Sequence, residues 1–189
     1  MIPPGLSFIS MSQKAWEAAE KSNLPKFYLN LKSYKKSLLS NSNPYTPAVN
    51  LVFALDEALK MMKEEGLDKI FFRHNKHKLA MSNAVKALNL KLFADEKYLS
   101  PSITAIKTEG MDAEEFRKTI KNNFDILLAG GQDHLKGKIF RVGHLGYVND
   151  RDIITVVSAI SNTLLGLGKI TTQQAGEALV VVSKYLEEN

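Results

Sequence analysis

The sequence of 189 residues contains no cysteine. This absence excludes a disulfide framework, a thiolate nucleophile and a zinc site built from cysteines, and it is compatible with a reducing compartment. No apolar run reaches the roughly 18 residues that a membrane-spanning helix needs. The N-terminus also lacks the basic flank, apolar core and cleavage site of a secretory signal. We therefore expect a cytoplasmic protein without a membrane partner.

Arginine is scarce. Four arginines and 21 lysines face 20 acidic residues, which gives a formal net charge of +5. The lysines are spread along the chain, whereas nucleic-acid binding needs positive charge clustered on one face. The stretch 26–36 does interleave lysines with Phe27, Tyr28 and Tyr34, and it could bind single strands by stacking and charge. A basic loop over a core-facing aromatic pair explains the same residues. We expect no nucleic-acid partner.

The first third of the chain carries strong turn and helix signals. Pro3, Pro4 and Gly5 predict a turn that leads into a strand-like stretch at 6–11. Ser12 is suited to cap the helix that follows. Apolar residues that recur every three or four positions predict a long amphipathic helix closed by Gly66. The expected elements are helix 13–21, an exposed Lys/Ser/Asn-rich loop at 32–44, and helix 48–65.

After residue 67 the pattern predicts an α+β arrangement. A second long helix should bury a stripe that includes Ile70, Phe71, Ala80 and Ala84. Short β-forming runs then alternate with amphipathic helices, one of them capped by Asp112. The expected elements are helix 68–89, strands at 90–93, 103–108, 125–129 and 139–142, helices 113–124 and 151–166, and a last helix from 171.

Arg141 is the most informative single residue, because an arginine stands between Phe140 and Val142 inside an apolar strand. Arginine is seldom buried without a partner, and its planar guanidinium suits a carboxylate bound by two parallel hydrogen bonds. A structural ion pair with a neighbouring Asp or Glu explains the residue equally well.

Tyr45, Thr46 and Pro47 stand where the long helix begins. A hydroxyl beside free N–H groups at the positive end of a helix forms a site for an anion such as phosphate. On spacing alone, an N-cap threonine followed by proline is the stronger interpretation.

Other candidate motifs are weak. The glycine-rich loop 130–137 has neither of the spacings typical of phosphate-binding loops. His74 and His77 lie three positions apart on a helix but have no evident third ligand, so we interpret them as surface side chains and expect no metal site. No Ser/His/Asp set or paired carboxylates can be assigned.

Five blocks follow one another along the chain. They are PPGLSFIS at 3–10, PKFYLNLK at 25–32, NPYTPAVNL at 43–51, AGGQDHLKGK at 129–138 and FRVGHLGYVNDRDI at 140–153. Together they resemble the C-terminal half of class V aminotransferases, which are fold-type I pyridoxal-phosphate enzymes of the alanine–glyoxylate and serine–pyruvate kind. The resemblance spans about residues 1–168, and the tail 169–189 matches nothing that we can place.

The resemblance assigns roles to residues. The family's substrate-carboxylate arginine falls on Arg141, and its threonine that contacts the cofactor phosphate of the neighbouring subunit falls on Thr46, with Tyr45 as its companion. The cofactor lysine of the family precedes the Pro-Pro-Gly turn at the end of a Ser-Gln-Lys motif, so we expect this chain to lack it. Lys14, in Ser12-Gln13-Lys14, follows the turn and is interpreted as a chance match.

The resemblance implies an α/β fold in four parts: a remnant of the large cofactor domain at 1–47, a bridging helix at 48–66, a small C-terminal α/β domain at 67–168 and a helical tail at 169–189. It implies pyridoxal 5′-phosphate as cofactor, a small amino acid and a 2-oxo acid as substrates, and a homodimer or a missing N-terminal half as partner. We expect the chain alone to be inactive. The alternative is a non-catalytic nucleic-acid-binding or subunit-interaction module.

Overall fold

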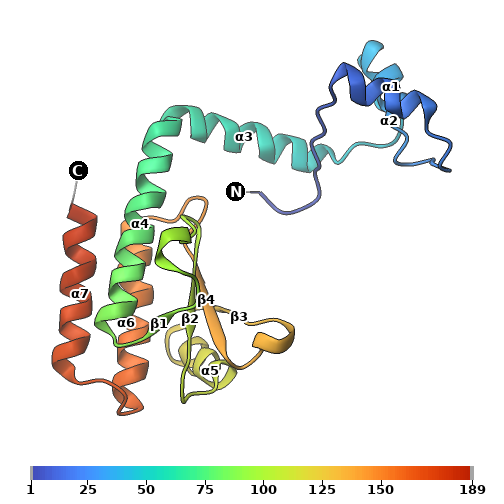
Figure 1. The fold of residues 1–189 in the computed structure, drawn as a ribbon. Helices are drawn as coiled ribbons and strands as arrows, with labels where there is room; N and C mark the ends of the chain where they lie inside the picture. Colours follow the sequence, from blue (N-terminus) through green and yellow to red (C-terminus); the bar gives the residue numbers. More distant parts are fainter. Residues whose placement is uncertain (1, 188–189) are drawn as a thin grey trace. The chain divides into compact units, whose positions relative to one another are not determined.

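Two compact units, residues 1–64 and residues 65–189, make up the chain. A computed structural model describes residues 2–187 (Figure 1). Within these residues no helix is both long and apolar enough to cross a membrane.

The first unit consists of three helices joined by loops. Ser12 accepts a hydrogen bond from the N–H of Ala15 and begins α1, and Asn30 accepts one from the N–H of Lys32 and begins α2. Both caps satisfy N–H groups that have no partner inside the helix. The helices are α1 (Gln13–Lys21), α2 (Leu31–Leu39) and α3 (Val49–Glu65), as predicted for the first and third.

Two expectations for this unit are wrong. Within the described chain, residues 6–11 form no strand, because the segment has no partner strand to complete its hydrogen bonds. The loop expected at 32–44 instead contains most of α2. Its lysines and leucines are good helix formers, and Asn30 supplies the start. Gly5 passes so close to α3 that a Cβ there would lie 2.6 Å from Cδ1 of Leu51.

The first unit has no core of its own. None of residues 2–64 is buried, although the unit carries many large apolar side chains. Phe27 is 80% exposed, Leu39 84% and Phe53 71%. Isolated exposed apolar residues are ordinary, but a whole unit without a buried one needs a covering surface.

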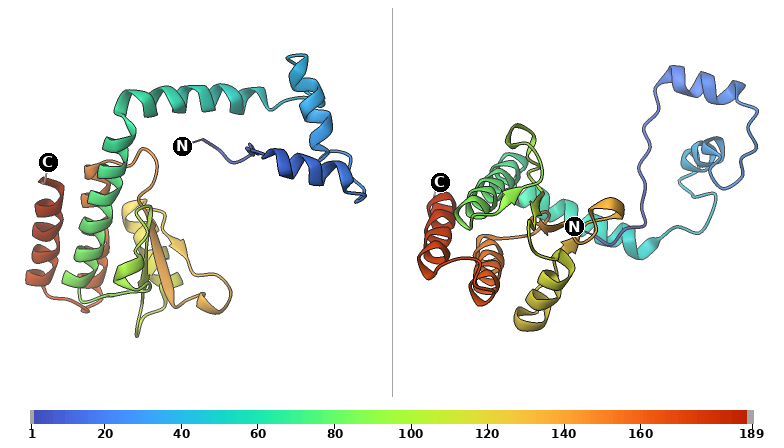
Figure 2. Two further views of the ribbon diagram at one scale, coloured as in Figure 1. Left: turned by 45° about the horizontal axis from the view of Figure 1, so that its top comes forward. Right: turned by 60° about the horizontal axis from the view of Figure 1, so that its bottom comes forward.

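The second unit packs helices on a four-stranded antiparallel sheet of order β1-β2-β4-β3. Figure 2 shows α4, α6 and α7 side by side, and α7 contacts both of the other two. The strands are β1 (Lys91–Leu92), β2 (Ile103–Lys107), β3 (Ala129–Gly130) and β4 (Ile139–Gly143), and the helices are α4 (Leu67–Ala87), α5 (Ala113–Phe124), α6 (Asp150–Gly166) and α7 (Thr172–Glu187).

One face of the sheet is covered by helices. Thr104 and Ile106 of β2, and Phe140 and Val142 of β4, are buried on this face. The Phe140 ring packs against Phe116 of α5 with 5.1 Å between ring centroids. Because side chains alternate along a strand, the residues between them point to the other face. Those residues, including Arg141, are only half-buried or exposed.

Most helix predictions for this unit are confirmed. Asp112 caps α5, and Asn149 caps α6 in a capping box with Asp152. The apolar stripe of α6 is buried: Ile153, Val156, Val157, Ile160 and Leu164. On α4, Ala80 and Ala84 are buried as expected, whereas Ile70 is half-buried and Phe71 is 65% exposed. The third strand is shorter than expected and begins only at Ala129.

Candidate functional site

Arg141 lies at the centre of β4, on the sheet face that no helix of this unit covers. Its Nε donates a hydrogen bond of 2.9 Å to the carbonyl oxygen of Gly130. Among residues 2–187 no carboxylate pairs with its guanidinium, so the structural ion pair is not formed by the described chain. The two terminal nitrogens therefore remain available to a ligand, and together they can donate two parallel hydrogen bonds to a carboxylate.

Alanines flank Arg141 on both sides. The antiparallel register places Ala105 of β2 and Ala129 of β3 directly opposite Arg141, on the same face. Their methyl groups leave the space beside the guanidinium open. The sheet thus presents one fixed cation on a row of small side chains.

The glycine-rich loop 130–137 forms a tight turn beside Arg141. Its first residue, Gly130, provides the carbonyl that orients Arg141. A Cβ on Gly131 would collide with the backbone of Leu135 in the short 3-10 helix Asp133–Leu135. The glycines therefore permit a tight turn that fastens the loop beside β4.

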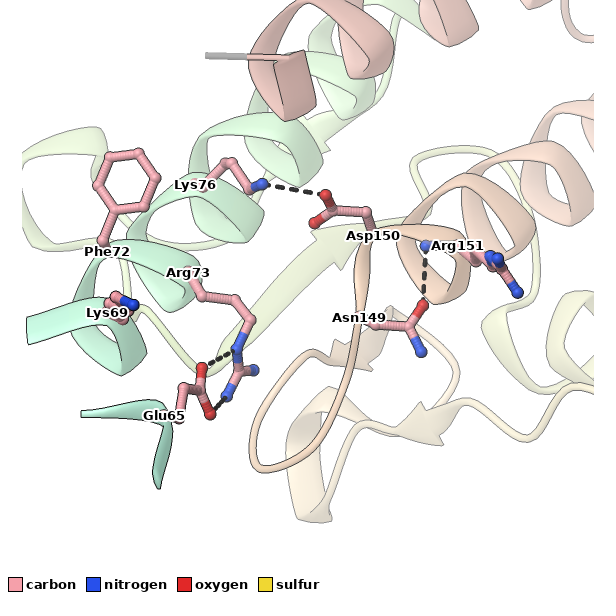
Figure 3. A pocket seen from close by; sticks show the side chains of 8 residues that line it. All are labelled: Glu65, Lys69, Phe72, Arg73, Lys76, Asn149, Asp150 and Arg151. Carbon is pink, nitrogen blue, oxygen red and sulfur yellow. Dashed lines mark hydrogen bonds and ion pairs between the residues drawn. The ribbon is translucent and has the colours of Figure 1, made fainter. Parts of the chain in front are cut away.

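The segment that follows β4 is held by Arg73 of α4. Nε and Nη2 of Arg73 donate to the two oxygens of Glu65 at 2.6 and 2.9 Å, and Nη1 donates to the carbonyls of Gly146 and Val148 at 3.0 and 2.9 Å. The hydrogen bond from Arg73 holds the pKa of Glu65 below its ordinary value, although partial burial opposes this. Figure 3 shows this pair in an open pocket of about 640 Å³. The turn between Arg141 and α6 is thereby fixed.

His77 is buried, which corrects the prediction of a surface side chain. It is 0% exposed, and its Nε2 lies 2.8 Å from Oδ1 of Asp150, whose Oδ2 accepts a hydrogen bond from Lys76. Burial lowers the pKa of His77, although Asp150 opposes the change, so the neutral ring donates Nε2–H. Burial raises the pKa of Asp150, but hydrogen bonds from His77 and Lys76 outweigh it and leave that pKa lowered. His77 thus links α4 to the start of α6.

His144, three residues after Arg141, is a second buried histidine. It is 0% exposed, and its Nε2 lies 2.8 Å from the hydroxyl of Thr104. Burial, followed by the nearby His77, lowers the pKa of His144 to about 4. Sequence reasoning missed this residue, because only the alternation of β4 and the position of Thr104 on β2 indicate that it faces inward.

Tyr45 and Thr46 belong to the first unit and precede α3. The Tyr45 hydroxyl donates to the carbonyl of Phe27 at 3.1 Å, and the Tyr45 ring packs against Phe27, Tyr28 and Tyr34. Thr46 is exposed, and α3 begins three residues later, so Thr46 is not the N-cap that spacing alone favoured. Tyr45 holds the loop in place through these contacts. No residue among 2–187 forms a hydrogen bond with the Thr46 hydroxyl, so this hydroxyl can bind a ligand.

The start of α3 fits an anionic group. The helix has 17 residues and no acidic residue in its first turn, unlike α5 and α6. Its positive end is therefore not neutralised by its own side chains. A threonine hydroxyl with helix N–H groups is a donor set that suits the phosphate of a cofactor. In the second unit, the free nitrogens of Arg141 suit the carboxylate of a substrate.

The basic stretch 26–36 is engaged within its own unit. Lys32 pairs with Glu20 at 2.6 Å, and Lys35 lies over the Trp16 ring at 4.5 Å. Lys14 is exposed in the first turn of α1. These contacts reduce the charge and the aromatic faces that the alternative nucleic-acid interpretation requires.

Comparison with known proteins identifies the family. No family model matches the chain. The chain is 55% identical over 168 residues to the soluble hydrogenase 42 kDa subunit of Anabaena cylindrica, a match that covers 89% of this chain and 44% of that protein. It is 34% identical over 196 residues to a serine–glyoxylate aminotransferase of Methylorubrum extorquens, covering 100% of this chain and 48% of the relative.

Solved structures agree with this result. The crystal structure of a ureidoglycine–glyoxylate aminotransferase from Bacillus subtilis superposes with a TM-score of 0.86 and 28% identity, over 97% of this chain and 49% of that chain. The chain belongs to the class V aminotransferase family. The predicted resemblance to the C-terminal part of its fold-type I architecture is confirmed. The chain spans about half the length of the curated relatives that it matches.

Proposed function

We propose that the chain forms part of a pyridoxal-phosphate-dependent aminotransferase that moves an amino group from a small amino acid, such as alanine or serine, to glyoxylate or pyruvate. Two relatives support this choice of substrates by their own descriptions, as a serine–glyoxylate and a ureidoglycine–glyoxylate aminotransferase. The observation that carries the proposal is the guanidinium of Arg141, which is fixed between two alanines and pairs with no carboxylate among residues 2–187.

Arg141 binds the α-carboxylate of the amino acid in this proposal. The Gly130 carbonyl occupies Nε and leaves the two terminal nitrogens for two parallel hydrogen bonds. Such charge-assisted, bidentate contacts are stronger than neutral ones and also set an angle. A substrate held at its carboxylate keeps its amino group and α-hydrogen in one orientation, which lowers the entropic part of the barrier.

Thr46 and the N-terminal N–H groups of α3 bind the cofactor phosphate. When bound, the pyridinium ring supplies an electron sink for the loss of the α-proton. The contribution of Thr46 is to hold the phosphate and so to place the ring. The aromatic packing of Tyr45 keeps the preceding loop in place.

The remaining half of the aminotransferase, or a second subunit, is the proposed partner of residues 2–64. These residues bury none of their own side chains, and the chain spans about half the length of its relatives. A surface with this many exposed aromatic and aliphatic residues is typical of a protein–protein contact. The assembly that we propose is a homodimer.

The decisive experiment replaces Arg141 by lysine in the holoenzyme that contains this chain. Lysine keeps the charge but cannot form two parallel hydrogen bonds, so we expect amino-acid binding to weaken by about 1–3 kcal/mol. Steady-state kinetics with the amino donor measures this as a raised KM. Arg151→Lys, an exposed arginine on α6, is the matched control. An unchanged apparent affinity for the amino donor in the Arg141 variant would refute the assignment.

A further inference from the structure

Two charged residues of α5 hold the turn that orients Arg141. Arg117 donates from Nε to the carbonyl of Leu128 at 2.7 Å and from Nη1 to Oε2 of Glu114 at 2.8 Å. Gly130, two residues after Leu128, accepts the hydrogen bond from Arg141. A continuous set of contacts therefore runs from α5 through residues 128–130 to the guanidinium on β4.

The pair also packs directly against Gly130. A Cβ on Gly130 would lie 2.5 Å from Nη1 of Arg117 and 2.6 Å from Oε1 of Glu114. Distances this short are not compatible with a side chain unless the pair moves. Oε1 of Glu114 is itself buried and has no hydrogen-bond partner among the described residues. Within the described part of the chain, the carboxylate is therefore held in place by Arg117 alone.

The Glu114–Arg117 pair is suited to hold the backbone that orients the Arg141 guanidinium. The Glu114–Arg117 pair is partly shielded, with side chains 41% and 22% exposed. Arg117 uses its rigid fork to join a carboxylate to a backbone carbonyl, which lysine cannot do with the same geometry. Strand β3, which contains Gly130, has only two residues, so it forms few hydrogen bonds with β4. The contacts from α5 therefore help to hold the short strand in place.

We propose that Glu114 and Arg117 are positioning residues for Arg141, and that Gly130 is required so that they can contact the turn. The inference rests on the proposed function of Arg141 as the carboxylate clamp. Movement of the pair shifts the Gly130 carbonyl, which releases Nε of Arg141 and lets the guanidinium turn away from the carboxylate. Orientation matters because a bidentate contact requires both nitrogens to meet both oxygens.

The first test observes the hydrogen bond itself in the 189-residue chain. The sequence has only four arginines, so the Nε–H signals can be assigned by NMR from single substitutions. In Gly130→Ala and in Arg117→Lys, we expect solvent exchange of the Arg141 Nε–H to accelerate about tenfold, the equivalent of one lost hydrogen bond. Gly176→Ala, where nothing lies within 4 Å of the added methyl, is the matched control and should leave the exchange unchanged.

Unchanged exchange in Arg117→Lys overturns the positioning role. This conservative variant keeps the positive charge beside Glu114, so it tests the proposal even if the alanine at position 130 prevents folding. Acceleration of the same size in Gly176→Ala also overturns it, because the effect would then reflect general loosening of the unit.

The second test separates this inference from the proposed function. Glyoxylate is titrated into the same chain, and its binding is followed by the backbone amide shifts of Ala105 and Ala129, which flank position 141 in the wild type and in every variant. A weaker midpoint in Arg141→Lys and in Arg117→Lys, with wild-type binding in Gly176→Ala, supports both proposals. Weaker binding in Arg141→Lys alone overturns the positioning role only. No saturable binding by the wild-type chain, or equal binding by Arg141→Lys, overturns the assignment of Arg141 as the clamp.

Discussion

Acidification should destabilise the second unit through one buried histidine, His144. The ring is 0% exposed in the folded state, and burial together with the nearby His77 lowers its pKa from 6.5 to about 4. The unfolded chain therefore binds a proton at a pH where the folded chain does not. The stability that the neutral ring contributes is fully present above pH 6.5 and is lost as the pH falls toward 4.

The size of the effect follows from the two pKa values. Each tenfold change in the protonation equilibrium corresponds to about 1.4 kcal/mol, so His144 accounts for about 3 kcal/mol of unfolding free energy between pH 6.5 and pH 4. That is a substantial part of the stability of a small domain, which is about 5–15 kcal/mol. His77, whose pKa is also lowered by burial, adds to the loss in the same direction.

The perturbation is His144→Gln, which removes this titration. Urea unfolding, followed by the NMR intensities of α6 amides, gives the stability of the second unit at each pH between 7 and 4. We expect the wild-type stability to fall more steeply than that of the variant, by about 3 kcal/mol over the interval. His134→Gln, at an exposed position, is the control and should follow the wild type. Parallel curves for wild type and His144→Gln would refute the reasoning.

Two further predictions concern the first unit. Thr46→Val in the holoenzyme removes one hydrogen bond to the phosphate and should weaken cofactor binding by about 1–3 kcal/mol. Dialysis against phosphate buffer measures how much cofactor is retained, and Thr46→Ser should restore retention. Equal retention in wild type and both variants contradicts a phosphate contact. In the 189-residue chain alone, the amides of α1, α2 and α3 should exchange with solvent far faster than those of α6, because residues 2–64 bury no side chain. Equal protection from hydrogen exchange in both units contradicts the need for a covering partner.

Local signals in the sequence predicted most helices well. Ser12 and Asp112 mark helix starts that the structure confirms, since capping depends on residues within one turn. The helix α2 was missed because five of its nine residues are lysine or serine, a composition that also occurs in exposed loops. The extended segment 6–11 was misassigned, because a strand exists only when a second strand pairs with it.

Predictions that depend on distant residues were less successful. His77 was expected on the surface, but its partner Asp150 lies 73 positions away. Arg141 was singled out by its apolar neighbours, whereas its orientation by Gly130 depends on how β3 pairs with β4. The family blocks indicated Arg141 and Thr46 together. Whether both serve the roles assigned to them stays a prediction.

The row formed by Ala105, Arg141 and Ala129 has a consequence for how substrate preference can change. Each residue lies on a different strand, and all three face away from the helices that form the core. A bulkier side chain at 105 or 129 would narrow the space beside the guanidinium without entering the core. In the proposed function, substitutions at positions 105 and 129 would therefore change which amino acid fits beside Arg141 while leaving the buried side chains in place.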